Sequence, residues 1–502
     1  MGRARILFAA AGCVLAAQAS ATTLKVGVPA WPPGFGNPYG SIAQPTSHTR
    51  STIYDALVKI DDAGKLAPVL ALKWEALPGN IWRFHLRPNV VFSNGEPFNA
   101  AAVKAAIDWL RRPDVTGNLL TAEVANVAEV RVIDEMTVDI VTKTTDAVLP
   151  KRLTIVMMVP PKAWAETSAE GFMQKPIGTG PYVLKDWGQT SGYTVIEASP
   201  TTWRKPKQID RVELHLLREP IRRTQALSAG QVDLTQAIGP DDIAGLEAQG
   251  IKVMVEQEAT VMGLFLPNQR NEGKPLHDVR VRQALNYAVN KDEIATVMLR
   301  GTTKPAGQGA IPGTFGYNPD LKPYPYDPAK AKALLKEAGY PNGFKMTARL
   351  QPAGPIDVNA VYQKVAADLQ AVGVQMELRP VLAPDWVRFY STGIWDGADA
   401  LSGNWNASAF GDTIRALEMY ACKRSGTFFC DQPTDALINA SNVELDEGKR
   451  EKLLQDAMAR FHDLAPSLFL VNYNQIVAYN KKLRNVALSR AGYIFEEMEI
   501  AE

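Results

Sequence analysis

The sequence predicts an α/β protein in which strands and helices alternate along the chain. Residues 81–87 alternate apolar with polar side chains, which is the period of a half-buried strand. Asn99 then precedes apolar residues at Val103, Ile107 and Leu110, a spacing typical of a capped helix with one buried face. The alternation continues without repeats or low-complexity tracts, which favours helices layered on sheets.

The other elements follow the same pattern in order. Residues 23–28 predict a strand that leads into a glycine- and proline-rich loop at 31–40, and the prolines oppose the helix start that a phosphate-binding loop needs. Residues 51–60 are expected to form a helix. Later strands are expected at 182–187, 193–197, 211–217, 374–378 and 466–473, and later helices at 222–229, 278–290, 327–339, 359–371 and 451–464.

Composition places the chain among ordinary globular proteins with room for two or more domains. The 502 residues are 46% hydrophobic and 21% charged. The 54 basic and 53 acidic residues nearly cancel, so charge gives no argument for a nucleic acid or an anionic membrane as partner. We expect a monomer that binds no nucleic acid.

The N-terminus predicts export. A basic start is followed by a short apolar run and Ala19-Ser20-Ala21, which together form a secretory signal cleaved after Ala21. The apolar run is too short to span a bilayer. Cys13 follows Ala10-Ala11-Gly12, a loose lipobox that lacks the usual leucine, so a lipid-anchored form is the weaker alternative. The predicted location is the periplasm.

Two cysteines remain after this cleavage, Cys422 and Cys430. An even pair in an exported chain predicts a disulfide that closes a small loop. By loop entropy such a bond contributes about 2–3 kcal/mol to stability.

Several motifs resemble one known family. The stretch L-A-P-V-L-A-L-K-W-E at 66–75 and the longer W-R-F-H-L-R-P-N-V-V-F-S-N-G-E-P-F-N-A-A-A-V-K at 82–104 carry the signature. They are joined by G-T-G-P-Y at 178–182 and D-V-R-V-R-Q-A-L-N-Y-A-V-N at 278–290. These segments resemble the peptide/nickel-binding family of bacterial solute-binding proteins, family 5, and the similarity runs from about residue 54 to 484.

The resemblance implies a two-lobed periplasmic-binding-protein fold of type II, with an extra subdomain inserted in the first lobe and a ligand cleft between the lobes. It implies the following division: signal peptide 1–21; lobe I 22–50, 179–262 and 475–502; inserted subdomain 51–178; lobe II 263–474.

The sequence offers no recognisable catalytic constellation. Its five histidines form no HExxH motif and no close pair with cysteine, and neither a G-x-S-x-G elbow nor a P-loop is present. We therefore expect binding without catalysis, with no cofactor and no direct metal ligation. A secreted hydrolase is the distant alternative.

Residues 394–412 are the strongest candidate for ligand binding, because they combine tryptophan with amide and hydroxyl side chains suited to a polar organic solute. The resemblance assigns Trp405 to a tryptophan of the peptide binders and Asn406 to the same segment. The aspartate that pairs with a peptide amino group in those proteins is replaced by Ser408 here, unless Asp396, Asp399 or Asp412 reaches in. The alternative interpretation is a surface loop with a core tryptophan.

Further candidates flank this segment. Phe35, Asn37 and Tyr39 come from the first loop, and Asn268 and Tyr473 from the crossover between lobes. For Tyr473, simple packing beside the hinge is the alternative.

The sequence thus predicts the periplasmic solute-binding component of an ABC importer, which closes on a peptide-like or other polar organic solute and delivers it to the permease. Alternative ligands are a sugar or opine conjugate, or a nickel or haem chelate.

Overall fold

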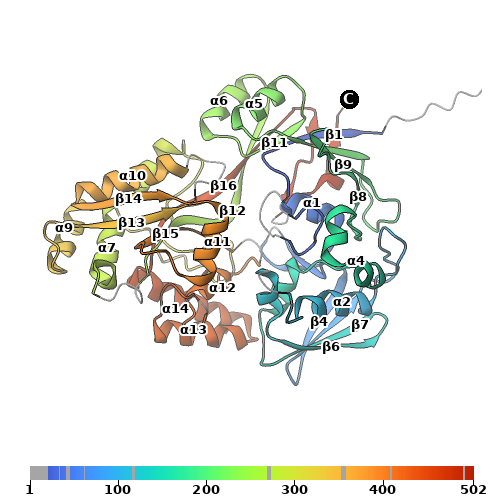
Figure 1. Cartoon of the computed structure of the whole chain (residues 1–502), viewed down its shortest axis with the longest axis horizontal. Helices are drawn as coiled ribbons and strands as arrows, with labels where there is room; N and C mark the ends of the chain where they lie inside the picture. The colour runs from blue at the N-terminus through green and yellow to red at the C-terminus, as the bar shows by residue number, and fades with distance from the viewer. Residues whose placement is uncertain are drawn as a thin grey trace, which may run out of the picture.

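The computed structural model describes residues 21–32, 34–40, 46–61, 63–115, 119–267, 273–351, 358–407, 410–424, 426–489 and 492–501. Residues 1–20, which hold Cys13 and most of the predicted signal, lie outside this set. The described chain forms two halves joined by two long strands, and the first strand and the C-terminus lie in the same half (Figure 1).

The half that holds the C-terminus is built on one end of a ten-stranded sheet. Its strands pair in the order β11-β1-β10-β9-β8, parallel through β10 and antiparallel beyond it. Two helices, α5 (Pro220–Ser228) and α6 (Ile243–Ala248), pack at this end. The strand bounds are β1 Thr23–Val28, β8 Tyr182–Asp186, β9 Tyr193–Ala198, β10 Arg211–Leu216 and β11 Leu234–Gln236.

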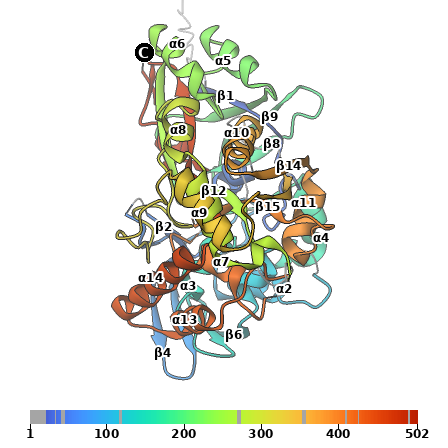
Figure 2. The same ribbon diagram turned by 90° about the vertical axis from the view of Figure 1, so that its left-hand side faces the viewer.

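The other half carries the opposite end of the same sheet, in the order β14-β13-β15. Figure 2 looks onto this half and shows its helices arranged around the strands. The strands are β13 Phe344–Leu350, β14 Val374–Pro380 and β15 Ala400–Asn406. The helices are α7 Val279–Ala288, α9 Pro328–Glu337, α10 Val358–Ala371, α11 Ala383–Thr392, α12 Ile414–Leu417, α13 Gln432–Val443 and α14 Glu447–Leu464.

Two antiparallel strands pass between the halves, β12 (Lys252–Phe265) and β16 (Ser467–Tyr479). They pair from Lys252↔Tyr479 to Phe265↔Ser467, and the ladder is interrupted between Gln257 and Thr260. A hinge of two strands with a break in their register can bend without disturbing the sheet on either side. The predicted lobe boundaries, 262/263 and 474/475, fall inside these strands, and the full division into domains stays a prediction.

A separate four-stranded sheet, β4-β5-β7-β6, forms a subdomain on the half that contains β1 (Figure 1). In β5 (Ile81–Leu86), Phe84 and Leu86 are buried as the alternation predicts. The Asn99 side chain accepts a hydrogen bond from the Ala101 backbone N–H and begins α2 (Ala100–Leu110), which confirms the predicted cap. The remaining bounds are β4 Ala71–Leu77, β6 Val127–Asp134, β7 Thr137–Thr142, α3 Leu149–Arg152 and α4 Pro161–Gln174.

The helix expected at 51–60 is wrong. The helix α1 (Thr46–Ile53) ends early, and β2 (Val58–Ile60) pairs with β3 (Leu66–Pro68). Val58 and Ile60 are buried while Lys59 is exposed, so this stretch follows the two-residue period of a strand and not the period of a helix. The other strands and helices predicted above are confirmed within a few residues, except that β16 continues six residues beyond its predicted end, to Tyr479.

Cys422 and Cys430 form the predicted disulfide, with their Cα atoms 4.8 Å apart. Among the described residues, every helix is too short or too polar to cross a membrane.

Candidate ligand cleft

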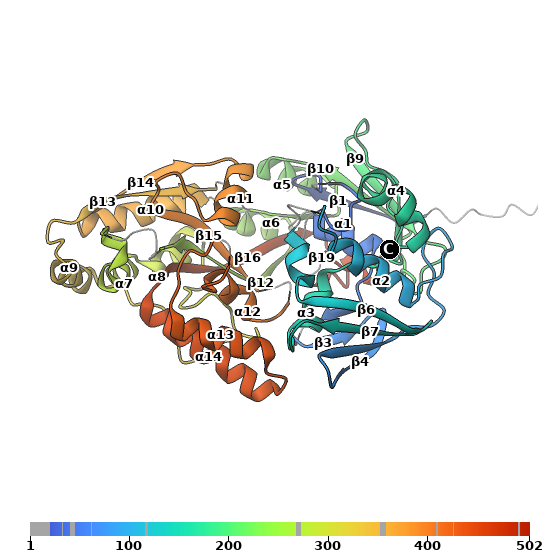
Figure 3. The ribbon, with the colours of Figure 1, turned by 60° about the horizontal axis from the view of Figure 1, so that its bottom comes forward.

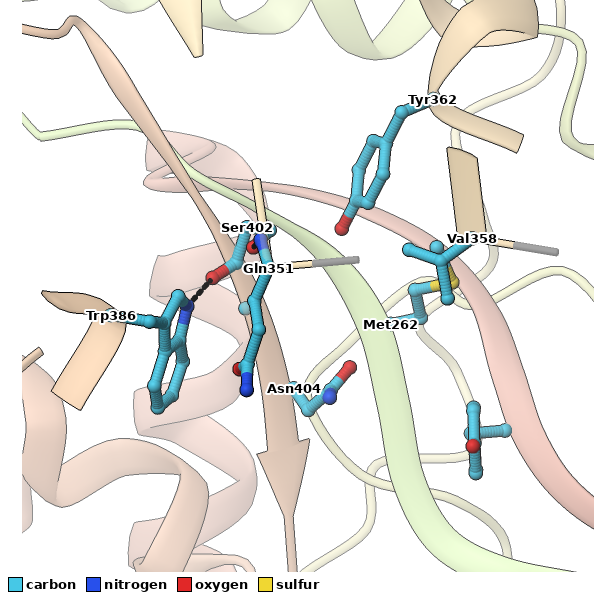
Figure 4. Close-up of a pocket in the computed structure, with 9 residues that line it drawn as sticks. Met262, Gln351, Val358, Tyr362, Trp386, Ser402 and Asn404 are labelled. Carbon is cyan, nitrogen blue, oxygen red and sulfur yellow. Dashed lines mark hydrogen bonds between the residues drawn. The ribbon is translucent and has the colours of Figure 1, made fainter. Parts of the chain in front are cut away.

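A pocket lies in the half built on β13–β15, beside the hinge strand β16. Figure 4 shows it from close by, with the Gln351 side chain drawn between the Trp386 ring and Asn404. Its walls come from the two hinge strands, β15, the end of β13, and the helices α10 and α11. The lining residues are Met262, Gln351, Val358, Tyr362, Trp386, Ser402, Gly403, Asn404 and Tyr473.

Trp386 is held in place by α11, a helix that buries only Phe389. Its indole N–H donates to the Ser402 backbone carbonyl at 2.9 Å, and its ring stacks on Tyr390 with centroids 5.1 Å apart. The four-residue spacing puts both rings on one face of the helix. The sequence signal for this aromatic face is the four-residue spacing of Trp386 and Tyr390 within D-W-V-R-F-Y, which lies before the segment 394–412 that was predicted to bind ligand.

Neighbouring groups fix the rest of the wall. The Tyr362 hydroxyl donates to the Gly263 carbonyl at 2.8 Å, and the Ser402 hydroxyl accepts from the Gln351 backbone N–H at 3.0 Å. Burial raises the pKa of Tyr362, so this phenol stays neutral. The nine lining residues therefore present amides, hydroxyls, a thioether and aromatic faces, without a carboxylate or a cation.

Trp405 lies on the opposite side of β15 from Asn404, because successive strand residues face opposite ways. Its side chain is fully buried, and its indole N–H donates to the Tyr420 hydroxyl at 2.7 Å. The ring packs on Phe265 and Phe469, with centroids 4.5 and 4.7 Å away. In this structure Trp405 is a core residue behind the cleft wall, and its contact with a solute stays a prediction.

Asn406 follows at the exposed end of β15, on the same face of the strand as Asn404. Tyr473 lines the pocket, and its contact with a solute stays a prediction. Ser408 and Asn268 lie outside the described residues.

The first loop belongs to the other half of the molecule. Tyr39 is buried there, stacked on Trp109 at 5.2 Å, and its hydroxyl donates to the Met157 carbonyl at 2.8 Å. Asn37 accepts from the Tyr39 backbone N–H, and the Phe35 ring meets Trp187 edge-on. The structure thus places these three residues in loop and core packing, outside the lining of the pocket that Tyr473 lines, and their contact with a solute stays a prediction.

The three acids that could have replaced the missing aspartate are all engaged elsewhere. Asp396 is exposed and pairs with Arg388 at 2.7 Å, and the hydrogen bond from Arg388 lowers the pKa of that carboxyl. Asp399 accepts from the Thr347 backbone N–H at 2.9 Å and pairs with Lys274.

Asp412 has no exposed surface and pairs with two cations, Lys151 and Arg450, each at 2.6 Å. Burial by itself raises the pKa of Asp412, but the two positive charges outweigh it and hold the pKa below its ordinary value. The carboxylate is therefore ionised and already neutralised. It has no charge left for a ligand ammonium group.

Nothing in the described part of the chain groups three or more histidine, cysteine, aspartate or glutamate side chains as a metal site would require. The lining of the described pocket offers hydrogen-bonding groups and aromatic faces, the kinds of contact that hold polar organic molecules.

Comparison with known proteins gives a consistent result. Residues 65–427 match the family model of bacterial extracellular solute-binding proteins, family 5. The chain is 28% identical over 492 residues to the glutathione-binding protein GsiB of Pectobacterium atrosepticum, covering 93% of this chain and 92% of that protein. It is 27% identical over 520 residues to the dipeptide-binding protein of Escherichia coli K12, covering 97% and 96%.

Among solved structures, the binding protein AgaA from A. tumefaciens R10 in complex with agropinic acid superposes with a TM-score of 0.81. It is 24% identical, and the match covers 96% of this chain and 99% of that protein. At this identity the likeness concerns the fold.

Proposed function

The chain belongs to the bacterial extracellular solute-binding proteins of family 5, and from this premise we propose how it recognises its solute. It has the two-lobed periplasmic-binding-protein fold and serves an ABC importer by binding a solute between its lobes. We propose that the solute is peptide-like or a small amide-bearing conjugate. Its uncharged part lies against the wall formed by Gln351, Trp386 and Asn404.

The observation that carries this proposal is the neutral wall. Amide side chains hydrogen-bond to peptide groups as donor and acceptor, and the Trp386 face offers area to an apolar or planar group. The relatives named for glutathione and for dipeptides support a ligand of this size and polarity. With Asp396, Asp399 and Asp412 engaged, the described wall supplies no counter-charge for a free amino group.

Calorimetry tests the wall directly. The solute retained by the purified protein is first identified by native mass spectrometry and then titrated alongside dialanine and its N-acetyl derivative. Trp386→Ala should weaken binding by about 1 kcal/mol or more, because an aromatic face is lost. Trp74→Ala, which removes a half-buried tryptophan from β4 in the four-stranded subdomain, is the matched control and should leave affinity unchanged.

The comparison of dialanine with its N-acetyl derivative tests whether the site recognises a free amino group. Equal affinity for free and acetylated dialanine fits a wall without an ammonium site, whereas loss of binding on acetylation would contradict it. Ser408→Asp should create preference for the free amino group, since a charged hydrogen bond contributes about 1.5–3 kcal/mol. If Trp405→Ala weakens binding and Trp386→Ala does not, the solute contacts lie on the Trp405 side instead.

We further propose that the mature chain starts near Thr22, acts as a monomer in the periplasm and returns its solute chemically unchanged. Ala19-Ser20-Ala21 and the family membership support export. The intact mass of the exported protein, light scattering and analysis of the recovered solute check the three points. An acyl group on Cys13 would overturn the first, and steady conversion of the solute the last.

A further inference from the structure

Ion pairs join the four-stranded subdomain to the opposite half of the molecule. α3 carries Lys151, whose ammonium group reaches Asp412 at 2.6 Å and also lies 3.9 Å above the Phe315 ring. Asp412 and Phe315 both belong to the half built on β13–β15. In Figure 3, α12–α14 of that half lie next to α3 and the four-stranded sheet.

A second set of pairs crosses the same contact. Arg152 of α3 pairs with Glu418, which follows α12, and Arg415 of α12 pairs with Glu123 of the subdomain. Charges of both signs therefore stand on both sides of the contact. We call the three crossing pairs Lys151–Asp412, Arg152–Glu418 and Arg415–Glu123 the latch.

Each half also contains an ion pair that does not cross the contact. Glu123 binds Arg152 at 2.9 Å within the subdomain, and Asp412 binds Arg450 through both carboxylate oxygens at 2.6 and 3.1 Å within the other half. If the surfaces separate, the buried acids on both sides still hold a cation. Opening therefore avoids the large cost of an uncompensated buried charge, so the contact can break and form again.

Burial gives the latch its strength in the closed state. The Glu123 and Asp412 side chains are 1% and 0% exposed, and Lys151 is 13% exposed. Attraction between charges is stronger in such a low-dielectric contact than at a surface, and dissolved salt screens it less. Once the surfaces part, water and salt stabilise the separated charges. Salt therefore favours the open form.

We propose that the latch sets the population of the closed state and so determines affinity from a place that the solute does not touch. Lys151, Arg152, Glu123 and Glu418 act as positioning residues for closure. The proposal rests on hinge closure in this family and is independent of where the solute lies.

Electron–electron distance measurements test it without a ligand. Spin labels at Glu129→Cys in β6 and Leu445→Cys after α13 report the separation across the contact, with the native disulfide left intact. Protein refolded from denaturant, and therefore free of retained solute, is measured at ionic strengths of about 0.01 M and 1 M. In the wild type, high salt should increase the long-distance fraction.

Lys151→Met and Glu418→Gln each remove one crossing pair and leave the internal pairs in place. Each should lower the closed-to-open ratio at low salt by about fivefold or more and weaken its salt dependence. Arg379→Gln is the matched control. It removes one positive charge from a pair that lies within β14 of a single half, Arg379–Glu377, whose side chains are 46% and 59% exposed.

Wild-type distances in both variants at both ionic strengths would overturn the proposal and identify the contact as a permanent interface. Circular dichroism establishes that each variant is folded. If Lys151→Met fails to fold, Glu418→Gln decides alone. Failure of the solute proposal, seen as unaltered binding in Trp386→Ala, leaves these distances unaffected, so the two tests fail separately.

Discussion

Buried positive charge is neutralised in different ways in two regions of this protein. At the contact between α3 and α12–α14, Lys151 and Arg450 share the carboxylate of Asp412. In the first turns of α7, Arg282 instead donates to main-chain carbonyls of Leu276, His277 and Leu464 at 2.8–3.0 Å, and none of these hydrogen bonds is to a carboxylate.

Arg223 of α5 repeats the second solution in the other half. Its guanidinium group donates to the carbonyls of Leu217, Arg218, Gln236 and Ala237. The carbonyl groups that surround each of these arginines all belong to one half of the molecule, so they move together with that half as a rigid body. Carboxylate pairs suit surfaces that come apart, because each charged group can exchange its partner for water. The difference between the regions therefore separates charge that fixes a fold from charge that controls a motion.

The largest effect is expected at the carboxylate site. Asp412→Asn leaves Lys151 and Arg450 buried without a counter-charge, which should reduce the free energy of unfolding by about 3–5 kcal/mol. Chemical denaturation measures this. Replacing Lys151, Asp412 and Arg450 together by apolar residues should recover most of the loss. A triple variant as unstable as Asp412→Asn would contradict the view that the unpaired charges cause it.

A smaller loss of stability is expected at Arg282, which is held by main-chain carbonyl groups. Arg282→Met leaves three buried carbonyl oxygens without their donor, at about 1–3 kcal/mol for an unsatisfied group, while it removes a charge whose desolvation already lowers the pKa of Arg282 to about 10. We expect a net destabilisation of about 2 kcal/mol. Unlike Lys151→Met, it should leave the distance across the latch unchanged. A change of that distance in Arg282→Met would contradict the distinction between the two regions.

Lys291 extends the comparison to a buried cation whose removal should increase stability instead of decreasing it. It is buried beside Asn286, whose side-chain oxygen lies 3.2 Å from its ammonium group, and burial lowers its pKa to about 7 from an ordinary 10.5. Between these two values the unfolded chain binds the proton and the folded chain does not, so this residue makes stability rise with pH across that window. Below pH 7 both states are protonated and its destabilising effect is complete.

Lys291→Met should therefore stabilise the protein by about 1 kcal/mol or more at pH 6 and flatten the rise in stability above pH 7. Unfolding curves in urea across pH 6–10 measure both effects. Lys330→Met is a control, since this exposed lysine of α9 contacts the Tyr287 hydroxyl at the surface and should leave the pH dependence unchanged. A steeper pH dependence in Lys291→Met would refute the assignment.

The sequence alone determined the features that depend on neighbours within a few residues and the family to which the long motifs point. The cap at Asn99, the alternation in β5, the helices that start at Asp278 and Asp327, and the disulfide between Cys422 and Cys430 are of this kind. Capping bonds and side-chain periodicity act over one or two turns, so they can be predicted locally. The strand at 58–60 was not predicted, because three residues are too few to show a clear two-residue period.

Only the tertiary structure decided which side of β15 lines the pocket. Trp405 and Asn404 are adjacent in sequence, yet strand alternation sends one into the core and leaves the other on the wall, and Trp386 joins that wall from a different helix. From the sequence, Asp412 was as good a candidate for ligand binding as Asp396 or Asp399. In the folded protein its carboxylate instead pairs with Lys151, 261 residues away in the chain. Charge pairs of this kind depend on distances between whole elements, which no local pattern of residues encodes.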